Sequence, residues 1–412
     1  MSRVPLDSSA SGEHAPHETT TSAGLAAWSQ VLTLSLTEIT SWGVLYYTIS
    51  VVLGPMERDL HWSQAAITGG YSLALLISGL MGVPIGRWLD HTRSPRALMA
   101  AGALLGVAGL VVWSGVTSQP VYYGLWIVLG IAMAATLYEP AFTTVAAWFP
   151  RRERALTVLT TVSGLASVIY LPATALLVEH FGWRTALLLL ALALLLGAAL
   201  PHAILLRPYP PASHVTDEAE LAGESPWRMW RFWQLVSGFA LAQLAISALV
   251  VYLIPYLGQQ GMATTQAATA SGLIGVIAIL GRILVTWRSS PQSRAALTAI
   301  LFLALALGII VLTLVRGPVG LALFLILFGA GFGMFSPARA GLVADRFGTR
   351  VYGRVNGQLA LVITLARAAG PSVVGLLLLQ GASFTEIFWL LAVFAALGGA
   401  LLWLPGGANK HG

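Results

Sequence analysis

The chain has 412 residues, of which 57% are hydrophobic and 9% are charged, whereas soluble proteins carry about a quarter charged residues. This composition excludes a soluble globular protein and predicts an all-α integral membrane protein. Because the sequence contains no cysteine, it also excludes disulfides, thiolate metal sites and cysteine nucleophiles.

The N-terminal segment is polar and lacks the short apolar core of a signal peptide. Residues 1–27 are therefore expected to form a disordered cytoplasmic tail. After this segment come twelve apolar runs of about 20 residues, each long enough for one transmembrane helix. The expected spans are 28–54, 64–86, 97–117, 120–147, 156–178, 184–206, 232–257, 265–287, 295–315, 319–341, 355–379 and 384–404.

The longest polar connection, residues 207–231, separates spans six and seven. It is expected to be a cytoplasmic linker between two six-helix halves, 28–206 and 232–404, with a cytoplasmic tail at 405–412. Fifteen arginines lie in or next to the even-numbered connections, against three in the odd-numbered ones. This positive-inside bias places both termini in the cytoplasm and predicts a multi-pass protein of the cytoplasmic membrane. The net charge of +6 is mostly this topology signal and indicates no nucleic-acid partner.

The two halves repeat each other in sequence. Matching residues occur in the same order in both halves; the aligned pairs are Pro140 with Pro337, Pro172 with Pro371, and Tyr47 with Tyr252. The last pair places Gln243 of span seven opposite Glu38 of span one. Duplicated six-helix halves around a central site are an architecture of transporters.

The segment "GRWLDHTRSPR" resembles the signature of the major facilitator superfamily between spans two and three, with Gly86, Asp90 and Arg96 in matching positions. It departs from that signature at His91, where a basic residue is usual, and at Arg93, where a second glycine is usual. The resemblance covers essentially the whole chain and implies that superfamily's fold of twelve helices. Gly86 would let helices approach closely, and Asp90 could hold donors of the neighbouring half in one state. We therefore expect Gly86, Asp90, Arg93 and Arg96 to form a gating motif.

Within the superfamily, "GPMERDLHWSQAAITGGYSLALL" and the arginine of "LGRILVTW" are similar to the monocarboxylate-porter-like branch. In that branch the arginine of span eight binds the substrate carboxylate, a role that the resemblance gives to Arg282. Those porters commonly carry an acidic residue four positions earlier, where this chain has Ala278, and a lysine in span one. The only lysine here is Lys410, so the branch's usual proton site is absent.

Four ionisable side chains fall inside the expected spans: Glu38, Glu139, Arg282 and Arg367. Each costs about 2.5 to 3.5 kcal/mol near the centre of a membrane helix, so they must be paired, hydrated or neutral. The acids lie in the first half and the bases in the second. Helical rise places three near the midplane and one somewhat inward of it. The candidate residues that line a cavity around them are Trp42, Tyr46, Tyr138, Gln243, Ser247 and Ser336.

A carboxylate is stabilised as an anion beside an arginine and as a neutral acid in an apolar wall. If the two halves rock between inward and outward states that change these surroundings, proton uptake and release by Glu38 or Glu139 are coupled to the side of the membrane from which the site is accessible. The sequence therefore predicts a secondary active transporter, coupled to protons, for a small organic anion such as a monocarboxylate. Its expected partners are the solute, protons and the lipid bilayer, with the chain acting as a monomer.

Three other readings stay open on the sequence alone. A static ion pair between helices would also explain the buried charges. A proton-driven exporter of drugs, metabolites or toxic oxyanions is an alternative, although the Gly-Pro pair of such exporters stands here in span eleven, "ARAAGPSVVG". A membrane sensor that binds without transporting is less favoured, because the chain has no sizeable polar domain. No nucleotide loop, His-Glu-x-x-His motif or serine elbow is present, so we expect no enzyme, no cofactor and no metal site.

Overall fold

The computed structural model describes residues 17–92, 94–149, 153–209, 226–286, 291–347 and 352–403. These ranges are helical almost throughout and contain no strand, because a helix satisfies its backbone hydrogen bonds internally where lipid cannot. The elements in chain order are α1 (His17–Ser41), η1 (Trp42–Tyr47), α2 (Thr48–Leu60), α3 (Gln64–Thr92), α4 (Pro95–Ser114), α5 (Gln119–Thr136), α6 (Tyr138–Trp148), α7 (Glu153–Ser163), α8 (Leu165–Leu194), η2 (Leu195–Ala199), α9 (Leu200–Leu205), η3 (Pro226–Arg228), α10 (Trp230–Gln259), α11 (Thr264–Thr286), α12 (Pro291–Leu314), α13 (Pro318–Phe347), α14 (Tyr352–Leu379) and α15 (Phe384–Trp403).

The twelve crossings predicted from the sequence are present in this architecture. Eleven helical segments of the described chain are long and apolar enough to span a membrane, and one of them, Arg154–Leu205, has 52 residues. It reverses direction inside α8 at Gly182, whose φ of 75° and ψ of 161° suit glycine and few other residues. This segment therefore supplies two crossings, the fifth and the sixth.

The first crossing begins earlier than predicted and changes its geometry midway. α1 is helical from His17, which lies inside the segment 1–27 that we expected to be disordered. The Leu-Ala-Ala run at residues 25–27 favours continuation of the helix toward the N-terminus. Between α1 and α2 the helix widens into a π-helix, η1. The predicted linker at 207–231 lies outside the described residues from 210 to 225, and the boundaries of the two halves remain predictions.

The fourth crossing is divided into α5 and α6. Leu137 has extended backbone angles, φ −85° and ψ −163°, and Pro140 follows three residues later. Proline lacks an N–H and its ring crowds the preceding turn, which breaks the helix at this point. As a result, Tyr138 and Glu139 occupy the first turn of α6.

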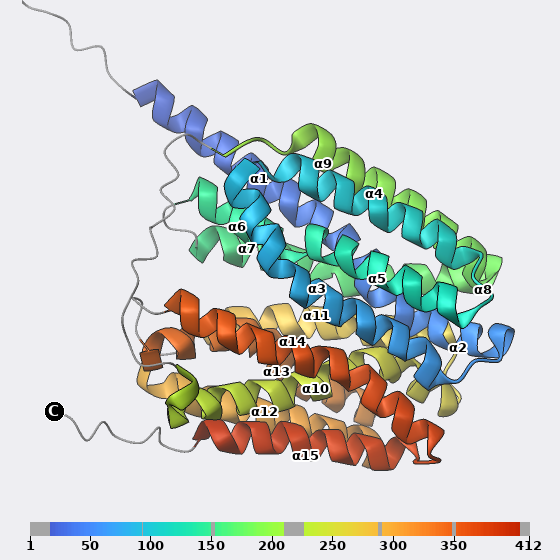
Figure 1. The fold of residues 1–412 in the computed structure, drawn as a ribbon. Coiled ribbons are helices and arrows are strands. Elements are labelled where there is room, and N and C mark those ends of the chain that lie inside the picture. Colours follow the sequence, from blue (N-terminus) through green and yellow to red (C-terminus); the bar gives the residue numbers. More distant parts are fainter. Residues whose placement is uncertain are drawn as a thin grey trace, which may run out of the picture.

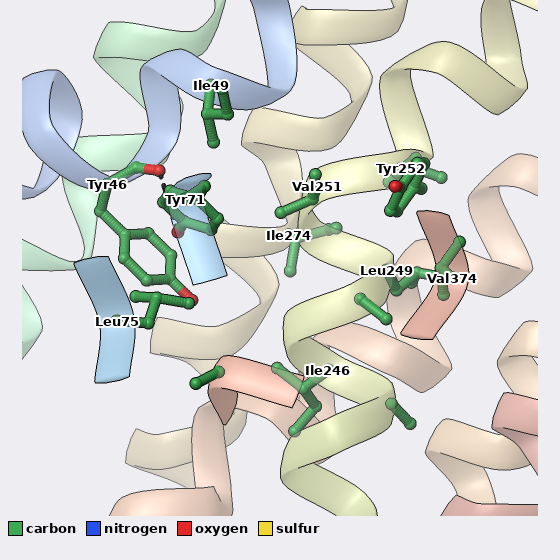
Figure 2. Close-up of a cluster of buried hydrophobic side chains, with 14 of the residues drawn as sticks. Tyr46, Ile49, Tyr71, Leu75, Ile246, Leu249, Val251, Tyr252, Ile274 and Val374 are labelled. Atoms are coloured by element: carbon green, nitrogen blue, oxygen red, sulfur yellow. Dashed lines mark hydrogen bonds between the residues drawn. The ribbon is translucent and has the colours of Figure 1, made fainter. Parts of the chain in front are cut away.

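The helices pack into two groups, α1–α9 and α10–α15, which lie one above the other in Figure 1. Between the groups, α3 packs on α14, α8 on α11 and α2 on α10. We call the end of the bundle where α1 begins and α15 ends the terminal end, at the left of Figure 1, and the other the opposite end. Apolar side chains face one another across the boundary: in Figure 2, Tyr46 and Leu75 of the first group face Ile246 and Val251 of α10.

The two groups are in close contact at the opposite end. Thr68 Oγ1 lies 3.0 Å from the hydroxyl of Tyr252, which donates to the carbonyl oxygen of Pro371 at 3.3 Å. A Cβ placed on Gly375 would lie 2.7 Å from the Cα of Ala65. The absence of a side chain at Gly375 is therefore what allows α14 to approach α3.

The terminal end is more open. A Cβ placed on Gly82, Gly86 or Gly357 would meet no atom of the described chain within 4 Å. In this structure Gly86 therefore makes no close helix approach to the described residues. The tight contacts between the groups lie at the opposite end and extend along α3 as far as Gly79, where a Cβ would overlap Thr364 of α14.

This arrangement predicts that enlarging Gly375 opens the opposite end. In Gly375→Leu, the new side chain would collide with the backbone of α3 and push the groups apart. Because the native chain lacks cysteine, a single Val251→Cys in buried α10 can report on access. We expect its labelling by a water-soluble maleimide to rise severalfold in Gly375→Leu. Gly124→Leu is the control, since no atom lies within 4 Å of a Cβ there; equal labelling in both variants would contradict the prediction.

Candidate functional site

Glu38 is fully buried in α1, with 0% of its surface exposed. Neither carboxylate oxygen has a hydrogen-bond partner among the described residues. The side chain interacts with that of Trp42, one turn further on, but the two fall short of a hydrogen bond, and the Trp42 indole nitrogen is buried without a partner as well. The hydroxyl of Ser35 donates to the carbonyl oxygen of Val31 at 2.7 Å, whereas that of Ser41 is buried and, like the carboxyl group, has no partner among the described residues. Glu38 is therefore a carboxyl group with nothing to balance a negative charge.

The π-helix η1 begins four residues after Glu38 and carries a series of aromatic rings. π-helical turns are rare and often occur at functional sites. The ring centroids of Trp42 and Tyr46 lie 4.8 Å apart, and those of Tyr46 and Tyr47 lie 5.1 Å apart. The hydroxyl of Tyr71 in α3 donates a hydrogen bond to the carbonyl oxygen of Tyr46 at 3.2 Å, drawn as the dashed line in Figure 2, and so links α3 to this π-helix.

The break at Leu137 brings Tyr138 against this turn. The ring centroid of Tyr138 lies 4.7 Å from that of Trp42 and 5.0 Å from that of Phe142, on which it stacks at 12°. We call Trp42, Tyr138 and Phe142 the aromatic wall; all three side chains are partly exposed. The Tyr138 hydroxyl is hydrogen-bonded to Ser163 Oγ at 2.8 Å. This hydroxyl is therefore already engaged within the first half.

Arg282 approaches the aromatic wall from the other half. It lies in α11, partly exposed, and its Nε donates to the carbonyl oxygen of Gly333 in α13 at 3.3 Å. Glycine is needed at 333 because a Cβ there would overlap the backbone of Ala278. Tyr138 lies within electrostatic range of both Arg282 and Glu38. Tyr138 is thus close to both the buried acid and an arginine of the opposite half.

Arg367 occupies a second position on the same side. It lies partly exposed in α14, within electrostatic range of Tyr46 and Tyr71. Both arginines therefore come from the second half and face aromatic residues of the first. The structure brings Glu38, Trp42, Tyr46, Tyr138, Arg282 and Arg367 to one region of the boundary.

Glu139 differs from Glu38, although both were expected inside the membrane. Its side chain is exposed, and its backbone carbonyl accepts a hydrogen bond from Thr143 at 3.0 Å. α6 packs on α1, α3, α4, α5 and α7, all of the first half, which leaves the face that carries Glu139 uncovered. Ser336 of α13 is likewise exposed.

The remaining cavity candidates lie inside the second half. Gln243 is 5% exposed and Ser247 is 1% exposed. Ser247 donates to the carbonyl oxygen of Leu244 at 3.1 Å, and a Cβ on Gly370 of α14 would overlap its Oγ. Close packing of α10 on α14 therefore removes these two side chains from open space in this structure.

The gating motif is only partly described. Gly86 lies near the terminal end of α3 and Asp90 in its last turns, while Arg96 is exposed at the start of α4. Arg93 lies outside the described residues. The role assigned to these four residues remains a prediction.

The pairing expected between Glu38 and a buried arginine does not occur in this structure. Within the described ranges the salt bridges are Arg184–Asp59 at 3.0 Å and Arg294–Asp345 at 2.9 Å. Glu38 takes part in neither, since it is enclosed in α1 while the arginines lie across the boundary. The acid and the arginines therefore lie in one region without forming an ion pair among the described residues.

A second polar cluster at the opposite end was not predicted from the sequence. A cavity of about 570 Å³ there is lined by Arg58, Asp59, Glu179 and Trp183 among others. The Trp183 indole donates to Asp59 at 3.2 Å, and the hydroxyl of Thr265, from the second half, donates to Glu179. These residues stand at the ends of predicted spans, where charge is ordinary, so the sequence carries no signal of their convergence.

Two groups of membrane-spanning helices, with one buried acid and two arginines where they meet, are typical of multi-pass transport proteins. The chain belongs to the Major Facilitator Superfamily, whose family model matches residues 34–371. It is 28% identical to monocarboxylate transporter 12 of Rattus norvegicus over 77% of this chain and 73% of that protein. It is also 28% identical to human monocarboxylate transporter 11, over 87% and 79% of the two chains, and 25% identical to the MFS transporter asaE of Aspergillus flavus, over 88% and 83%.

Solved structures show the same fold at lower identity. The nucleoside transporter NupG matches with a TM-score of 0.72 at 14% identity, over 90% of this chain and 98% of that one. A bacterial homologue of the human lysosomal transporter Spinster, solved in an inward-facing and occupied conformation, matches with a TM-score of 0.69 at 16% identity, over 95% and 97%.

The unpartnered state of Glu38 predicts that removing its carboxyl group stabilises the protein. Glu38→Leu should raise the free energy of unfolding by about 1 kcal/mol or more, since an unsatisfied buried polar group is lost. Were Glu38 one member of a buried ion pair, the same change would instead cost about 3 to 5 kcal/mol. Denaturation of purified protein in detergent measures the difference. Glu57→Leu is the control, because Glu57 Oε2 accepts a hydrogen bond from Gln64 at 2.8 Å and should show no gain.

Proposed function

We propose that the protein is a secondary active transporter that moves a small organic anion of the monocarboxylate type together with protons, by alternating access. The observation that carries this proposal is the buried carboxyl group of Glu38, which has no hydrogen-bond partner among the described residues, together with Tyr138, which lies within electrostatic range of both Glu38 and Arg282 of the other half. The relatives named as monocarboxylate transporters support the substrate class.

The two arginines provide the anion site of this proposal. A carboxylate is held most strongly by guanidinium groups, whose planar fork of donors matches its two oxygens. Arg282 and Arg367 lie in one half and are partly exposed at the boundary, so a solute between the halves can reach them. Rings of the opposite half limit water around the site, which strengthens the attraction.

Glu38 provides the proton site. An ionised carboxylate without partners in an apolar surrounding is costly, and protonation removes that cost. When a substrate anion occupies the arginines, it satisfies them and Glu38 stays neutral. When the anion leaves, the arginines attract the nearest carboxylate, which favours release of the Glu38 proton. Substrate and proton therefore bind and leave together.

Alternating access follows from the contacts between the two groups of helices. Contact at the opposite end and separation at the terminal end correspond to one of two states, and rocking would exchange them. We infer that the terminal end faces the cytoplasm, as the arginine distribution predicts, in a protein that resides as a monomer in the cytoplasmic membrane. The described state then admits solute from the cytoplasm.

Glu38→Gln tests the proton site. Purified protein in liposomes should take up pyruvate or lactate when an inward proton gradient is imposed, and the variant should lose the dependence on that gradient. Uptake of radiolabelled substrate at several pH differences measures this. Glu57→Gln, which changes an acid of the same crossing at the opposite end, should keep the dependence. Undiminished proton-driven uptake in Glu38→Gln would exclude Glu38 as the coupling residue.

Arg282→Gln and Arg367→Gln test the anion site. Hydrogen bonds to charged groups contribute about 1.5 to 3 kcal/mol each, so each variant should raise the dissociation constant for pyruvate roughly 10- to 150-fold. Substrate-dependent thermal stabilisation of the purified protein measures the constant. Arg228→Gln, an exposed position outside the boundary, should leave it unchanged. If both boundary variants bind pyruvate like the native protein, the carboxylate site lies elsewhere.

A further inference from the structure

The rings nearest the candidate site are gathered in one half of the protein. Trp42, Tyr138 and Phe142 follow one another at centroid distances of 4.7 and 5.0 Å, and each is partly exposed. Other aromatic side chains of this half, such as Trp113, Trp126 and Tyr122, are almost completely buried. Partly exposed rings at the boundary between the halves are therefore available to a solute.

The sequence repeat shows that the fold itself does not require these rings. With Tyr47 aligned to Tyr252, Trp42 corresponds to Ser247; with Pro140 aligned to Pro337, Phe142 corresponds to Arg339. The second half thus folds in the same way without aromatic residues at two of the three positions. The three rings also pack against the apolar cores of the first half, but the repeat does not dictate an aromatic residue at the positions of Trp42 and Phe142.

The aromatic wall and the two arginines come from opposite halves of the protein. Arg282 is within electrostatic range of Tyr138 and comes from α11 of the second half, whereas the rings come from η1 and α6 of the first. The Tyr138 hydroxyl is already bonded to Ser163, so the wall offers ring faces and edges but few free polar groups. A ligand that satisfies both sides carries an anionic group at one end and a flat apolar group at the other.

We propose that the solute is an aromatic monocarboxylate, whose carboxylate binds Arg282 and whose ring packs against Trp42, Tyr138 and Phe142. This inference rests on the proposed function and narrows its substrate class. Aromatic rings pack on one another in stacked or edge-on arrangements at centroid distances of about 4.5 to 7 Å, beyond the gain from burying their area. Short aliphatic acids fill the anion site and leave the wall uncovered.

A matched pair of ligands tests the proposal. Phenylpyruvate and pyruvate share the 2-oxo carboxylate and differ in the ring. We expect phenylpyruvate to bind with a dissociation constant roughly 2- to 12-fold or more below that of pyruvate, as ring pairing implies. Thermal stabilisation of the full-length purified protein gives both constants, and uptake into proteoliposomes shows whether the ring-bearing acid is also carried.

Variants of the aromatic wall then show whether the rings cause the preference. Trp42→Leu and Phe142→Leu should each reduce the ratio of the two constants toward one by weakening phenylpyruvate binding more than pyruvate binding, and Tyr138→Phe should keep the ratio. Trp88→Leu is the control, since Trp88 lies 53% exposed near the terminal end of α3. If the rings were only structural, the leucine variants would weaken the binding of phenylpyruvate and pyruvate by the same factor, and that result would overturn the proposal. A preference for phenylpyruvate that neither leucine variant changes would also overturn it.

The ligand pair also separates this inference from the function on which it rests. If pyruvate binds in an Arg282-dependent way and phenylpyruvate binds no more tightly, the aromatic substrate class is wrong and the anion transporter stands. If the protein binds and carries neither acid, both proposals fail.

Discussion

Hydrocarbon offers no hydrogen-bond partner, and this constraint governs every polar group in the protein. Backbone groups pair within the helices, and hydroxyl groups donate to the carbonyl oxygen one turn back, as Thr144 does to Pro140 and Ser271 to Ala267. An ionised carboxylate cannot do this, because it only accepts, and the N–H groups inside a helix are already used. Glu38 therefore depends on a proton, water or a cation from outside its own helix, and that dependence is what makes it suitable for coupling.

The sequence sufficed for the number of crossings, because each of them must be long and apolar. It did not reveal the interruptions. The reversal at Gly182 and the break at Leu137 each depend on backbone angles at one residue, and a glycine or a nearby proline inside an apolar run does not determine those angles. The π-helix η1 carries no local sequence signal at all. The extension of α1 to His17 was not predictable, because a polar composition such as that of residues 1–27 is typical of disorder.

The site was predictable where charge is conspicuous. Glu38, Arg282 and Arg367 stand out in apolar runs, and the structure brings them to one boundary. Exposure was not predictable: Glu139 and Glu38 look alike in sequence, yet the break at Leu137 turns α6 so that one is exposed and the other buried. The alignment of Gln243 with Glu38 likewise says nothing of the close packing between α10 and α14 that encloses Gln243.

Gly182 has a mechanical consequence for the first half. The fifth and sixth crossings meet there without intervening loop residues. Both are part of α8, which packs on α11 of the second half and also on α4 of its own half. A hairpin with no slack transmits displacement: if one arm slides along its axis, the other must follow or the angles of Gly182 must change. Extra residues at this turn would let the two arms move independently. The short turn at Gly182 therefore couples motion at the boundary with the second half to motion inside the first half.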